Sequence, residues 1–512
     1  MSKLCRLEQY LELLESKDLV IEYSISNELE KTPIKYISCN SKDITSNTLF
    51  ICKGAHFREA FLSDAIDRGA ICYISEKKYN GIMDSPYIIV NDIRKAMAYI
   101  ADYFYDRAWS KLNLVGITGT KGKSTTTYFI RYIFDEYLRS INEPLSGVVS
   151  SIDTYDGVID IKSHITTPES MDLNKHFNNA VKSGIKYMEM EVSSQALKYD
   201  RVLGVNFNVG CFLNIGYDHV SDIEHKDFDD YFKSKLRIFE QSEVACVNLN
   251  TEHLEEVLEA SKKSSKVITF GLNIEDADVC GYDVRKDDNY ILFRAKTKRF
   301  DRDFKLCIPG LFNVENALAA IAICEVLDIP EKYIYEGLKK AKVKGRMEVY
   351  NNENKKIIAI VDYAHNKLSF EKLFESVKAE YPGRKIVTVF GCPGKKALDR
   401  RKDLGEISGR YSDKVIITED DPGEESVVDI CKEISRFVEV QGCNYSIVID
   451  RGRAIEEAIM DVKEESVILI AGKGNETTQK RGIEYIDYPS DVEFTKKFLY
   501  QYDRKQHHNK KY

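Results

Sequence analysis

Gly119-Thr120-Lys121-Gly122-Lys123-Ser124-Thr125 is the stretch that decides the fold, because it stands between an apolar run and a helix-like segment. The apolar run covers residues 112–117, and the helix-like segment covers residues 126–137. A buried strand, a glycine-rich turn and a helix opening on Lys-Ser-Thr form a phosphate cradle. In it, backbone N–H groups face the phosphate oxygens, the lysine reaches the terminal phosphates and a hydroxyl binds Mg²⁺. The stretch therefore predicts a domain that consumes a nucleoside triphosphate.

The spacing of this loop departs from the common form. The glycine that usually stands six residues before the lysine would be residue 117, which is Ile, and the nearest glycines are Gly116 and Gly119. The alternative is a glycine turn that holds no ligand. The strand before the loop and the helix after it favour phosphate binding.

Bulk composition limits the class of protein. A chain of 512 residues suggests about three domains at ~150 residues each. The hydrophobic fraction of 43% and the charged fraction of 30% are typical of a globular protein. A net charge of −8 argues against broad nucleic-acid binding but leaves room for local basic pockets. We expect a monomer with small-molecule partners.

Cysteine usage and hydropathy indicate the compartment. The twelve cysteines form no CxxC pair, and most lie in apolar runs, so they are interpreted as core thiols of a reducing cytosol. Residues 1–10 lack the apolar segment of a signal peptide, and no stretch approaches ~18 apolar residues. We therefore expect a cytoplasmic protein that does not span a membrane.

Short apolar runs alternating with helical patterns predict α/β structure throughout, in three domains: a small one over 1–110, a central doubly wound one over 111–344 and a Rossmann-like one over 345–512. The expected strands cover residues 36–39, 48–52, 71–74 and 87–90, then 187–192, 208–215, 244–248 and 267–270, and finally 357–361, 385–390, 414–418 and 466–470. The polar tail, 502–512, is expected to fray, with His507 and His508 solvated.

Acidic residues follow the central strands. Glu189 and Glu191 lie near the end of the strand 187–192 and share a face, so either carboxylate fits a Mg²⁺ site. The next strand leads into Asp218-His219, which fits either a metal site or a hydrogen-bonded turn. Lys235 stands among apolar neighbours in a helical pattern and, by itself, is interpreted as a surface lysine with a buried stem.

Three strand-to-loop junctions of the third domain carry acids, a histidine and glycines. They cover residues 361–365, 418–423 and 471–476, and together they suggest a substrate crevice. For Asp420-Asp421-Pro422-Gly423 the alternative is ordinary β-turn chemistry.

In order and spacing, these segments resemble the Mur ligases, the ATP-dependent amide-forming enzymes of peptidoglycan precursor synthesis, and most nearly the members that add the third amino acid. The resemblance runs from about residue 36 to residue 480. Its motifs are the loop 119–125, Thr166-Thr167-Pro168-Glu169, and residues 191–197, 214–219, 310–320, 345–348, 362–365, 450–451 and 471–476, together with the helix bearing Lys235.

The resemblance implies a role for each matching position. Lys123, Glu191, His219 and Lys235 would be catalytic, and Ser124, Glu191, His219 and a carbamylated Lys235 would hold Mg²⁺. ATP would contact Gly119, Thr120, Lys121, Gly122, Lys123, Ser124, Thr125, Asn313, Asn316, Arg346, Asp362 and His365. The UDP-muramoyl-peptide would contact Ser41, Thr166, Thr167, Ser193 and Arg201, and the amino acid Asp420, Asp421, Gly472 and Glu476.

The implied reaction joins an amino acid to UDP-N-acetylmuramoyl-L-alanyl-D-glutamate. The acceptor carboxylate attacks the γ-phosphate of ATP, and the amine then attacks the acyl phosphate. Closure of the third domain would exclude water.

Several positions depart from the family pattern. Asn40-Ser41-Lys42 replaces Asp-Ser-Arg, Gln195 and Asn475 stand where histidine is usual, Asn366-Lys367 replaces Thr-Pro, and the loop 391–396 lacks a glycine–aspartate pair. Asp420-Asp421-Pro422-Gly423 replaces the Asp-Asn-Pro-Arg whose arginine grips the distal carboxylate of diaminopimelate. An acidic Asp421 favours a cationic distal end, as in lysine or ornithine.

Other functions stay open. A specialised paralogue would couple another amino acid or use another acceptor, as folylpolyglutamate- or cyanophycin-synthesising relatives do. A non-catalytic nucleotide-binding relative would have no need of Lys123, Glu191, His219 or Lys235, yet all four are present.

Overall fold

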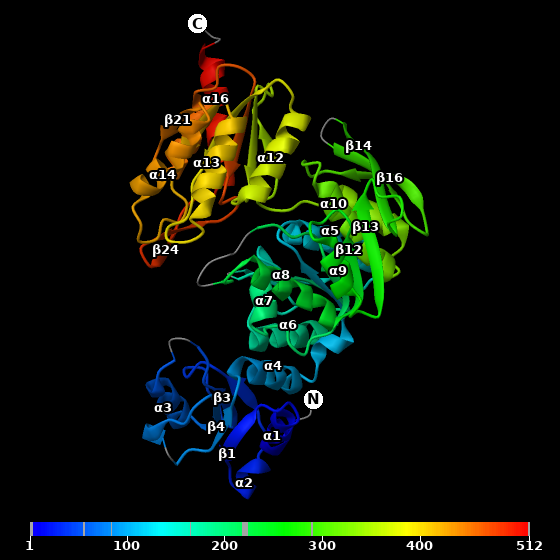
Figure 1. Ribbon diagram of the computed structural model, residues 1–512, viewed down its shortest axis with the longest axis vertical. Helices are drawn as coiled ribbons and strands as arrows, with labels where there is room; N and C mark the ends of the chain where they lie inside the picture. The colour runs from blue at the N-terminus through cyan, green and yellow to red at the C-terminus, as the bar shows by residue number, and fades with distance from the viewer. Residues whose placement is uncertain are drawn as a thin grey trace.

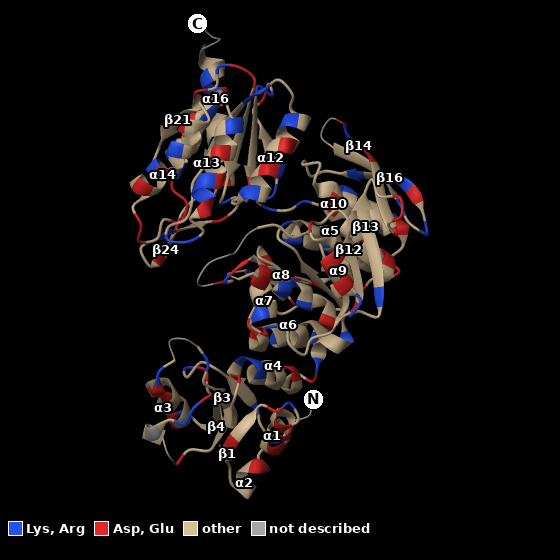
Figure 2. Ribbon diagram, in the orientation of Figure 1, with Lys and Arg blue, Asp and Glu red and all other residues tan. Residues whose placement is uncertain are grey.

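A computed structural model describes residues 4–54, 57–82, 84–163, 165–217, 224–287 and 290–509. Figure 1 shows three bodies stacked along the long axis, with the N-terminal domain at one end, the phosphate-loop domain in the middle and the C-terminal domain at the other end. Lys and Arg positions are mixed with Asp and Glu positions along the ribbon of all three (Figure 2). Among the described residues, no helix has both the length and the apolar surface to cross a membrane.

The N-terminal domain is a five-stranded sheet of order β1-β5-β4-β3-β2, in which only β1 is antiparallel to its neighbour. Helices α1 and α4 pack on one face and α3 on the other. The elements are β1 (Val20–Ser24), β2 (Tyr36–Ser38), β3 (Thr48–Ile51), β4 (Ala70–Ser75), β5 (Tyr87–Val90), α1 (Leu7–Glu15), α2 (Asn27–Glu30), α3 (Glu59–Asp67) and α4 (Ile93–Phe104).

The central domain is built on an eleven-stranded sheet of order β16-β15-β14-β13-β12-β11-β6-β10-β7-β8-β9. From β14 to β7 neighbouring strands are parallel, and antiparallel strands extend both edges. The strands are β6 (Asn113–Thr118), β7 (Gly147–Val149), β8 (Asp153–Tyr155), β9 (Asp160–Lys162), β10 (Tyr187–Glu191), β11 (Phe207–Phe212), β12 (Ser242–Asn248), β13 (Lys266–Leu272), β14 (Val279–Asp287), β15 (Tyr290–Lys296) and β16 (Asp301–Leu306).

Helices cover both faces of this sheet. One layer contains α5 (Lys123–Ser140), α10 (Asn313–Val326) and α11 (Glu331–Lys340). The other contains α6 (Ser170–Lys182), α7 (Ser194–Lys198), α8 (Phe228–Leu236) and α9 (Leu254–Ser261). The parallel strands end beside the N-termini of α5 and α7, which is where a doubly wound sheet presents its ligands.

The C-terminal domain has a six-stranded sheet of order β17-β18-β22-β19-β20-β21, antiparallel only at β17. Helices α12, α13 and α14 pack on one face, and α15 and α16 on the other. The elements are β17 (Glu348–Asn351), β18 (Ile357–Asp362), β19 (Lys385–Phe390), β20 (Lys414–Ile417), β21 (Asn444–Ile447), β22 (Ser466–Ala471), the hairpin β23 (Thr478–Arg481) and β24 (Glu484–Asp487), α12 (Lys367–Glu380), α13 (Asp399–Tyr411), α14 (Val427–Val440), α15 (Arg451–Met460) and α16 (Asp491–Asn509).

The expected strands all form, and the α/β class and the three-body architecture are confirmed. The expectation of a frayed tail is wrong for residues 502–509, which continue α16. Tyr502 is buried in the core, and Asp503 accepts hydrogen bonds from Asn352 Nδ2 (2.9 Å) and Glu353 N (3.0 Å). His507 Nε2 also lies 2.7 Å from Glu353 Oε2, so residues 503 and 507 fasten the last turns of the hydrophilic helix to the segment after β17.

Candidate functional site

The phosphate loop forms as the sequence predicts, between β6 and the N-terminus of α5. Gly122 precedes α5 with φ at 85°, in the left-handed region that favours glycine. A Cβ at this position would lie 2.2 Å from Asn316 Oδ1, so the close approach of α10 also requires glycine. Glycine at this position thus lets α10 pack directly against the phosphate loop.

Asn214, at the end of the neighbouring strand β11, fixes the backbone of the loop. Its Oδ1 accepts from Lys121 N (2.8 Å), its Nδ2 donates to Lys121 O (3.1 Å), and its carbonyl accepts from Thr120 N (3.0 Å). These bonds set the orientation of the loop before any phosphate binds. The sequence placed Asn214 in a motif but gave it no role, because only the pairing of β11 with β6 brings it to the loop.

Two lysines converge under the loop. Lys123 Nζ and Lys235 Nζ each donate to the carbonyl oxygen of Gly119 over 2.9 Å. Lys235 is only 2% exposed, and its ammonium lies 4.7 Å from the centroid of the Tyr231 ring. The interpretation of Lys235 as a surface lysine, made from its neighbours alone, is therefore wrong: α8 buries it against the phosphate loop.

The two glutamates of β10 have different surroundings. Glu191 Oε1 accepts from both the backbone N (2.9 Å) and the hydroxyl (3.1 Å) of Ser151, and that hydroxyl is 3.0 Å from Ser124 Oγ. Glu189 lies deeper, where Ser146 Oγ donates to it, and burial raises its pKa well above the usual range against the opposing charge of Arg131. The geometry therefore separates Glu191, at the loop, from Glu189, in the core.

A cavity of about 590 Å³ opens over the phosphate loop and is walled by both the central and the C-terminal domains. Thirteen of the residues implied by the resemblance line it: Thr120, Lys121, Gly122, Lys123, Ser124, Thr125, Thr166, Glu191, Asn313, Asn316, Arg346, Asp362 and His365. Asn313 and Asn316 are joined by a side-chain bond of 2.9 Å at the start of α10. The structure thus brings the expected nucleotide residues to one place.

The C-terminal wall of this cavity follows β18. Asp362 accepts from the backbone N of Met347 (2.8 Å) and of Ala364 (2.7 Å). Burial raises its pKa, and the charge of Arg346 opposes that shift. Arg346 donates to Ser124 Oγ (3.3 Å), and its guanidinium lies 4.5 Å from the centroid of the Tyr363 ring. Arg346 therefore connects the two domains at the phosphate loop.

The expected acceptor residues form a chain that leads away from Glu191. Thr167 Oγ1 donates to Glu191 O (2.9 Å) and accepts from Ser193 N (3.0 Å), and Arg201 Nη1 donates to Thr167 O (3.1 Å). Ser41 lies in the N-terminal domain, buried in the loop after β2. His219 and Asp218 lie outside the described residues.

The expected amino-acid residues gather at the carboxyl ends of β20 and β22. A Cβ on Gly472 would lie 2.4 Å from Asp420 Oδ2, so the two loops touch. Lys473, which the sequence left unassigned, is 3% exposed and donates to Asp421 Oδ1 and Glu476 Oε2, each over 2.8 Å. The charge of Asp421 is thus already paired with a lysine of this chain.

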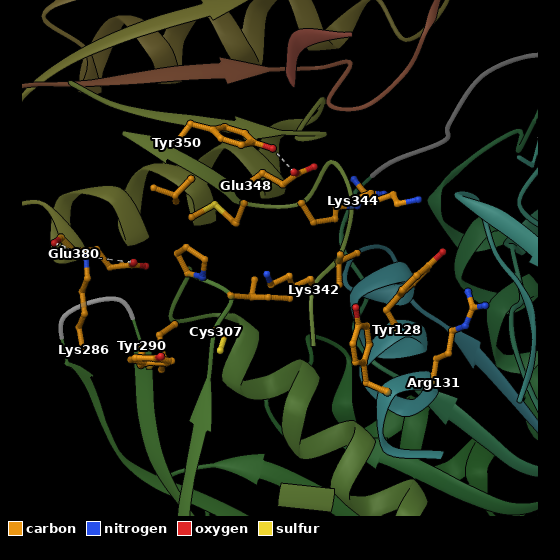
Figure 3. A pocket seen from close by; sticks show the side chains of 18 of the residues that line it. Tyr128, Arg131, Lys286, Tyr290, Cys307, Lys342, Lys344, Glu348, Tyr350 and Glu380 are labelled. Atoms are coloured by element: carbon orange, nitrogen blue, oxygen red, sulfur yellow. Dashed lines mark hydrogen bonds and ion pairs between the residues drawn. The ribbon is translucent and has the colours of Figure 1, made fainter. Parts of the chain in front are cut away.

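A second, larger cavity of about 990 Å³ lies beside the linker between the domains. Figure 3 shows Tyr128 and Arg131 of α5 on one side and Lys286 with Glu380 on the other. Lys342 and Lys344, from the segment between α11 and β17, and Glu348, the first residue of β17, lie between them. Arg346 and Met347 line both cavities.

Comparison with known families identifies the architecture. Residues 117–324 match the Mur ligase middle domain, and residues 345–474 match the Mur ligase, glutamate ligase domain. The chain belongs to the Mur ligase family. Its N-terminal domain lies outside both matched ranges.

Several Mur ligases are similar over most of the chain. A UDP-N-acetylmuramoyl-L-alanyl-D-glutamate--2,6-diaminopimelate ligase of Clostridioides difficile is 37% identical over 87% of this chain and 91% of its own. UDP-N-acetylmuramoyl-L-alanyl-D-glutamate--L-lysine ligases of Enterococcus faecalis and Streptococcus thermophilus are 35% and 36% identical, over 94% and 96% of this chain and 96% and 99% of theirs.

A solved diaminopimelate-ligase structure has the same fold (TM-score 0.66, 21% identity, 99% of this chain and 100% of that one). A MurF ligase of Thermotoga maritima in complex with ADP superposes with a TM-score of 0.61 at 18% identity, covering 92% and 98% of the two chains.

Proposed function

We propose that this Mur ligase is an ATP-dependent amide ligase that adds an amino acid to UDP-N-acetylmuramoyl-L-alanyl-D-glutamate during peptidoglycan precursor synthesis. One observation carries the proposal: the phosphate loop and Glu191 of the central domain face Asp362 and His365 of the C-terminal domain across one cavity. Such a cavity lets ATP bind between the domain that receives the acceptor and the domain that delivers the amino acid. Relatives named for this reaction are 35–37% identical.

In the first step the terminal carboxylate of the acceptor attacks the γ-phosphorus of ATP, forming an acyl phosphate and releasing ADP. Lys123 and the N–H groups at the start of α5 stabilise the charge on the transferring phosphoryl group. The hydroxyl of Ser124 and the carboxylate of Glu191 fit a Mg²⁺ site, because hard oxygen donors from two elements meet beside the phosphate loop. His219 and a carbamylated Lys235 would complete that site, and the bound cation would screen phosphate charge.

In the second step the amine of the amino acid attacks the acyl carbon, and phosphate leaves. The amino acid would bind at Asp420, Asp421, Gly472 and Glu476, while Thr166, Thr167, Ser193 and Arg201 hold the acceptor. Enclosure between the two domains protects the acyl phosphate from water. The Arg346 bridge between the phosphate loop and the C-terminal wall is suited to align the two half-sites.

We propose lysine or another diamino acid with a cationic distal end as the added residue. Gly423 stands where an arginine would grip a distal carboxylate, and four carboxylates, Glu419, Asp420, Asp421 and Glu476, lie in the two loops. Asp421 and Glu476 both pair with Lys473, so Asp420 carries more of the charge argument than either of them. We further propose that the enzyme acts as a monomer in the cytoplasm, where ATP is available.

The test is ADP release by the purified chain with Mg²⁺, ATP and UDP-N-acetylmuramoyl-L-alanyl-D-glutamate, with lysine, ornithine and meso-diaminopimelate in parallel. Turnover that needs both the acceptor and one amino acid supports the ligase. Turnover with diaminopimelate alone would keep the ligase and overturn the proposed amino acid. The absence of ADP with all three would reject this acceptor and favour a specialised paralogue.

A further inference from the structure

Two loops of the N-terminal domain leave its sheet at the edge that faces the central domain. In the parallel pair β2–β3, Ser38 is in register with Phe50. Ser41 and Lys53 each lie three residues further along their chains, so both leave the carboxyl end of the sheet at the same level. The family resemblance implies that Ser41 contacts the uridine nucleotide of the UDP-muramoyl-peptide.

Lys53 crosses the domain boundary. Its ammonium donates to Oε2 of Glu169, the residue that precedes α6 in the central domain. The other oxygen of the same carboxylate, Oε1, lies 2.8 Å from Arg201 Nε. The Lys53 and Arg201 side chains are 17% and 12% exposed, so both cations lie largely buried around one shared carboxylate.

The cluster has an excess of positive charge. Burial raises the pKa of Glu169, but the bond from Lys53 and the nearby charges of Arg201 and Arg94 outweigh it and hold that pKa below its usual range. Arg94, at the start of α4, stacks its guanidinium 4.1 Å from the centroid of the Tyr199 ring. A single ionised carboxylate therefore faces three cations from two domains.

Lys53, Arg201 and Arg94 have more N–H donors than the carboxylate of Glu169 can accept. An ammonium has three N–H donors and a guanidinium five. The bonds described here use one donor of Lys53, on Glu169, and one of Arg201, on Thr167, while Arg201 Nε is close to Glu169 without donating a hydrogen bond to it. The surplus donors and the surplus charge suit an anion that binds beside Glu169 without displacing it.

The position of the cluster indicates which kind of anion binds there. Ser41 lies on the N-terminal side, and Thr167 connects the cluster to Glu191 on the other side through its bond of 2.9 Å to the Glu191 carbonyl. An acceptor with its nucleotide at Ser41 and its reacting carboxylate near Glu191 must carry its diphosphate between them. We propose that Lys53 is a specificity-determining residue that binds the diphosphate of the nucleotide-linked acceptor, and that Glu169 positions Lys53 and Arg201 for it; this rests on the proposed function.

The alternative is that Lys53 and Glu169 only hold two domains together. A role in diphosphate binding and a role in holding the domains together predict different changes in ligand affinity. A diphosphate-binding lysine contributes to the affinity for UDP and not to that for uridine, whereas a domain latch affects both equally. Titration calorimetry of the full chain with UDP and with uridine, in the absence of ATP, therefore separates them.

We expect the wild type to bind UDP more tightly than uridine. Lys53→Met should weaken UDP binding about tenfold, near the lower end for a hydrogen bond to a charged group, and leave uridine unchanged. Lys53→Arg should recover most of the loss, because it keeps the charge. Glu169→Gln should weaken UDP binding less than Lys53→Met does, since both cations remain in place.

Lys186→Met is the matched control. Lys186 pairs with Glu143 just before β10, at the amino end of that strand in the central sheet, so its substitution should change neither affinity. Equal losses for UDP and uridine in Lys53→Met, an unchanged UDP affinity, or a wild type that does not prefer UDP would each overturn the inference. Thermal unfolding of each variant shows whether the substitution disturbs folding. If Lys53→Met has a folding defect, the UDP and uridine affinities of Lys53→Arg test the inference instead.

Turnover distinguishes this inference from the proposed function. A wild type that releases ADP, together with a Lys53→Met variant of unchanged acceptor KM, would overturn the diphosphate contact and keep the ligase. A wild type without turnover in the presence of the acceptor would reject the proposed function, whatever the calorimetry gives.

Discussion

Lys123 and Lys235 donate to the same atom, the carbonyl oxygen of Gly119, each over 2.9 Å. Two ammonium groups that share one acceptor carry like charges, which repel each other. Carbamylation of Lys235 would convert this repulsion into attraction, because the modified side chain is an anion. The geometry thus gives a physical reason for a modification that the family resemblance implies.

If Lys235 acts as a carbamate, Lys235→Ala should lower kcat by roughly a hundredfold, the range seen when one charge-stabilising group is lost. Formate or acetate should restore part of the rate, since a small carboxylate can occupy the space of the carbamate. Steady-state ADP release with and without these anions measures both effects. Loss of activity that no carboxylate restores would contradict an acidic role for this side chain.

Asn214→Ala should loosen the phosphate loop, because the side chain holds the loop backbone on both its donor and its acceptor side. We expect the KM for ATP to rise about tenfold, which corresponds to the loss of one or two net hydrogen bonds. The KM for the acceptor should change little. Asn208→Ala, at the amino end of the same strand β11, removes a bond of 2.8 Å from the backbone N of Leu114 and serves as the comparison. Equal effects of the two variants on ATP would refute the loop-holding role.

Asp420 should give the amino-acid site its pH dependence. Burial raises the pKa of Asp420 to about 7, against the charges of Lys473 and Arg451, while Asp421 and Glu476 add to the rise. Because the carboxylate attracts a cationic substrate only when ionised, the KM for the amino acid should fall as the pH rises from 6 to 8. Asp420→Asn should remove that dependence. A profile unchanged by the substitution would assign the titration to another group.

Asp421→Asn should change the choice of amino acid. The carboxylate pairs with Lys473, so its loss removes one of the two carboxylates to which the buried ammonium donates and makes that ammonium more available to an anion. We expect the ratio of kcat/KM for lysine to that for diaminopimelate to fall about tenfold, as for the loss of one charged hydrogen bond. Competition assays with both amino acids measure the ratio. An unchanged or increased ratio would mean that Asp421 does not favour the cationic substrate.

Arg451 and Asp491 should contribute to stability rather than to catalysis. Arg451 Nε and Nη2 donate to the two oxygens of Asp491 over 2.6 and 2.8 Å, and both side chains are almost fully buried between α15 and α16. Asp491→Asn leaves a buried guanidinium without its anion, so we expect a loss of about 3–5 kcal/mol in the free energy of unfolding. Chemical denaturation of both proteins measures it. A loss below 1 kcal/mol would show that the neutral amide suffices.

Much of the fold could be predicted because its strands are short, apolar and bounded by helical patterns. The strand Lys385–Phe390 was predicted to the residue. The antiparallel extensions of the central sheet could not be, since β14 and β15 alternate polar and apolar residues, and nothing local in the sequence gives their partner. The last turns of α16 were missed for a related reason: their stability comes from Asn352 and Glu353, some 150 residues away.

The nucleotide half of the candidate site could be predicted because its residues sit in one motif or follow parallel strands. The partners that orient them could not. Ser151, which binds Glu191, comes after the three-residue strand β7 and has no signature. Lys53 and Glu169 are separated by 116 residues and meet only through the packing of two domains. Pairs of this kind belong to tertiary structure rather than to any local pattern.

The segment from Val343 to Met347 is a partition between two chambers, since Arg346 and Met347 face both of them. A compound shaped to the larger chamber would contact this partition on the side away from the phosphate loop. It would press on the guanidinium that reaches Ser124 without resembling ATP. The partition is therefore a surface that an inhibitor can reach from outside the cavity over the phosphate loop.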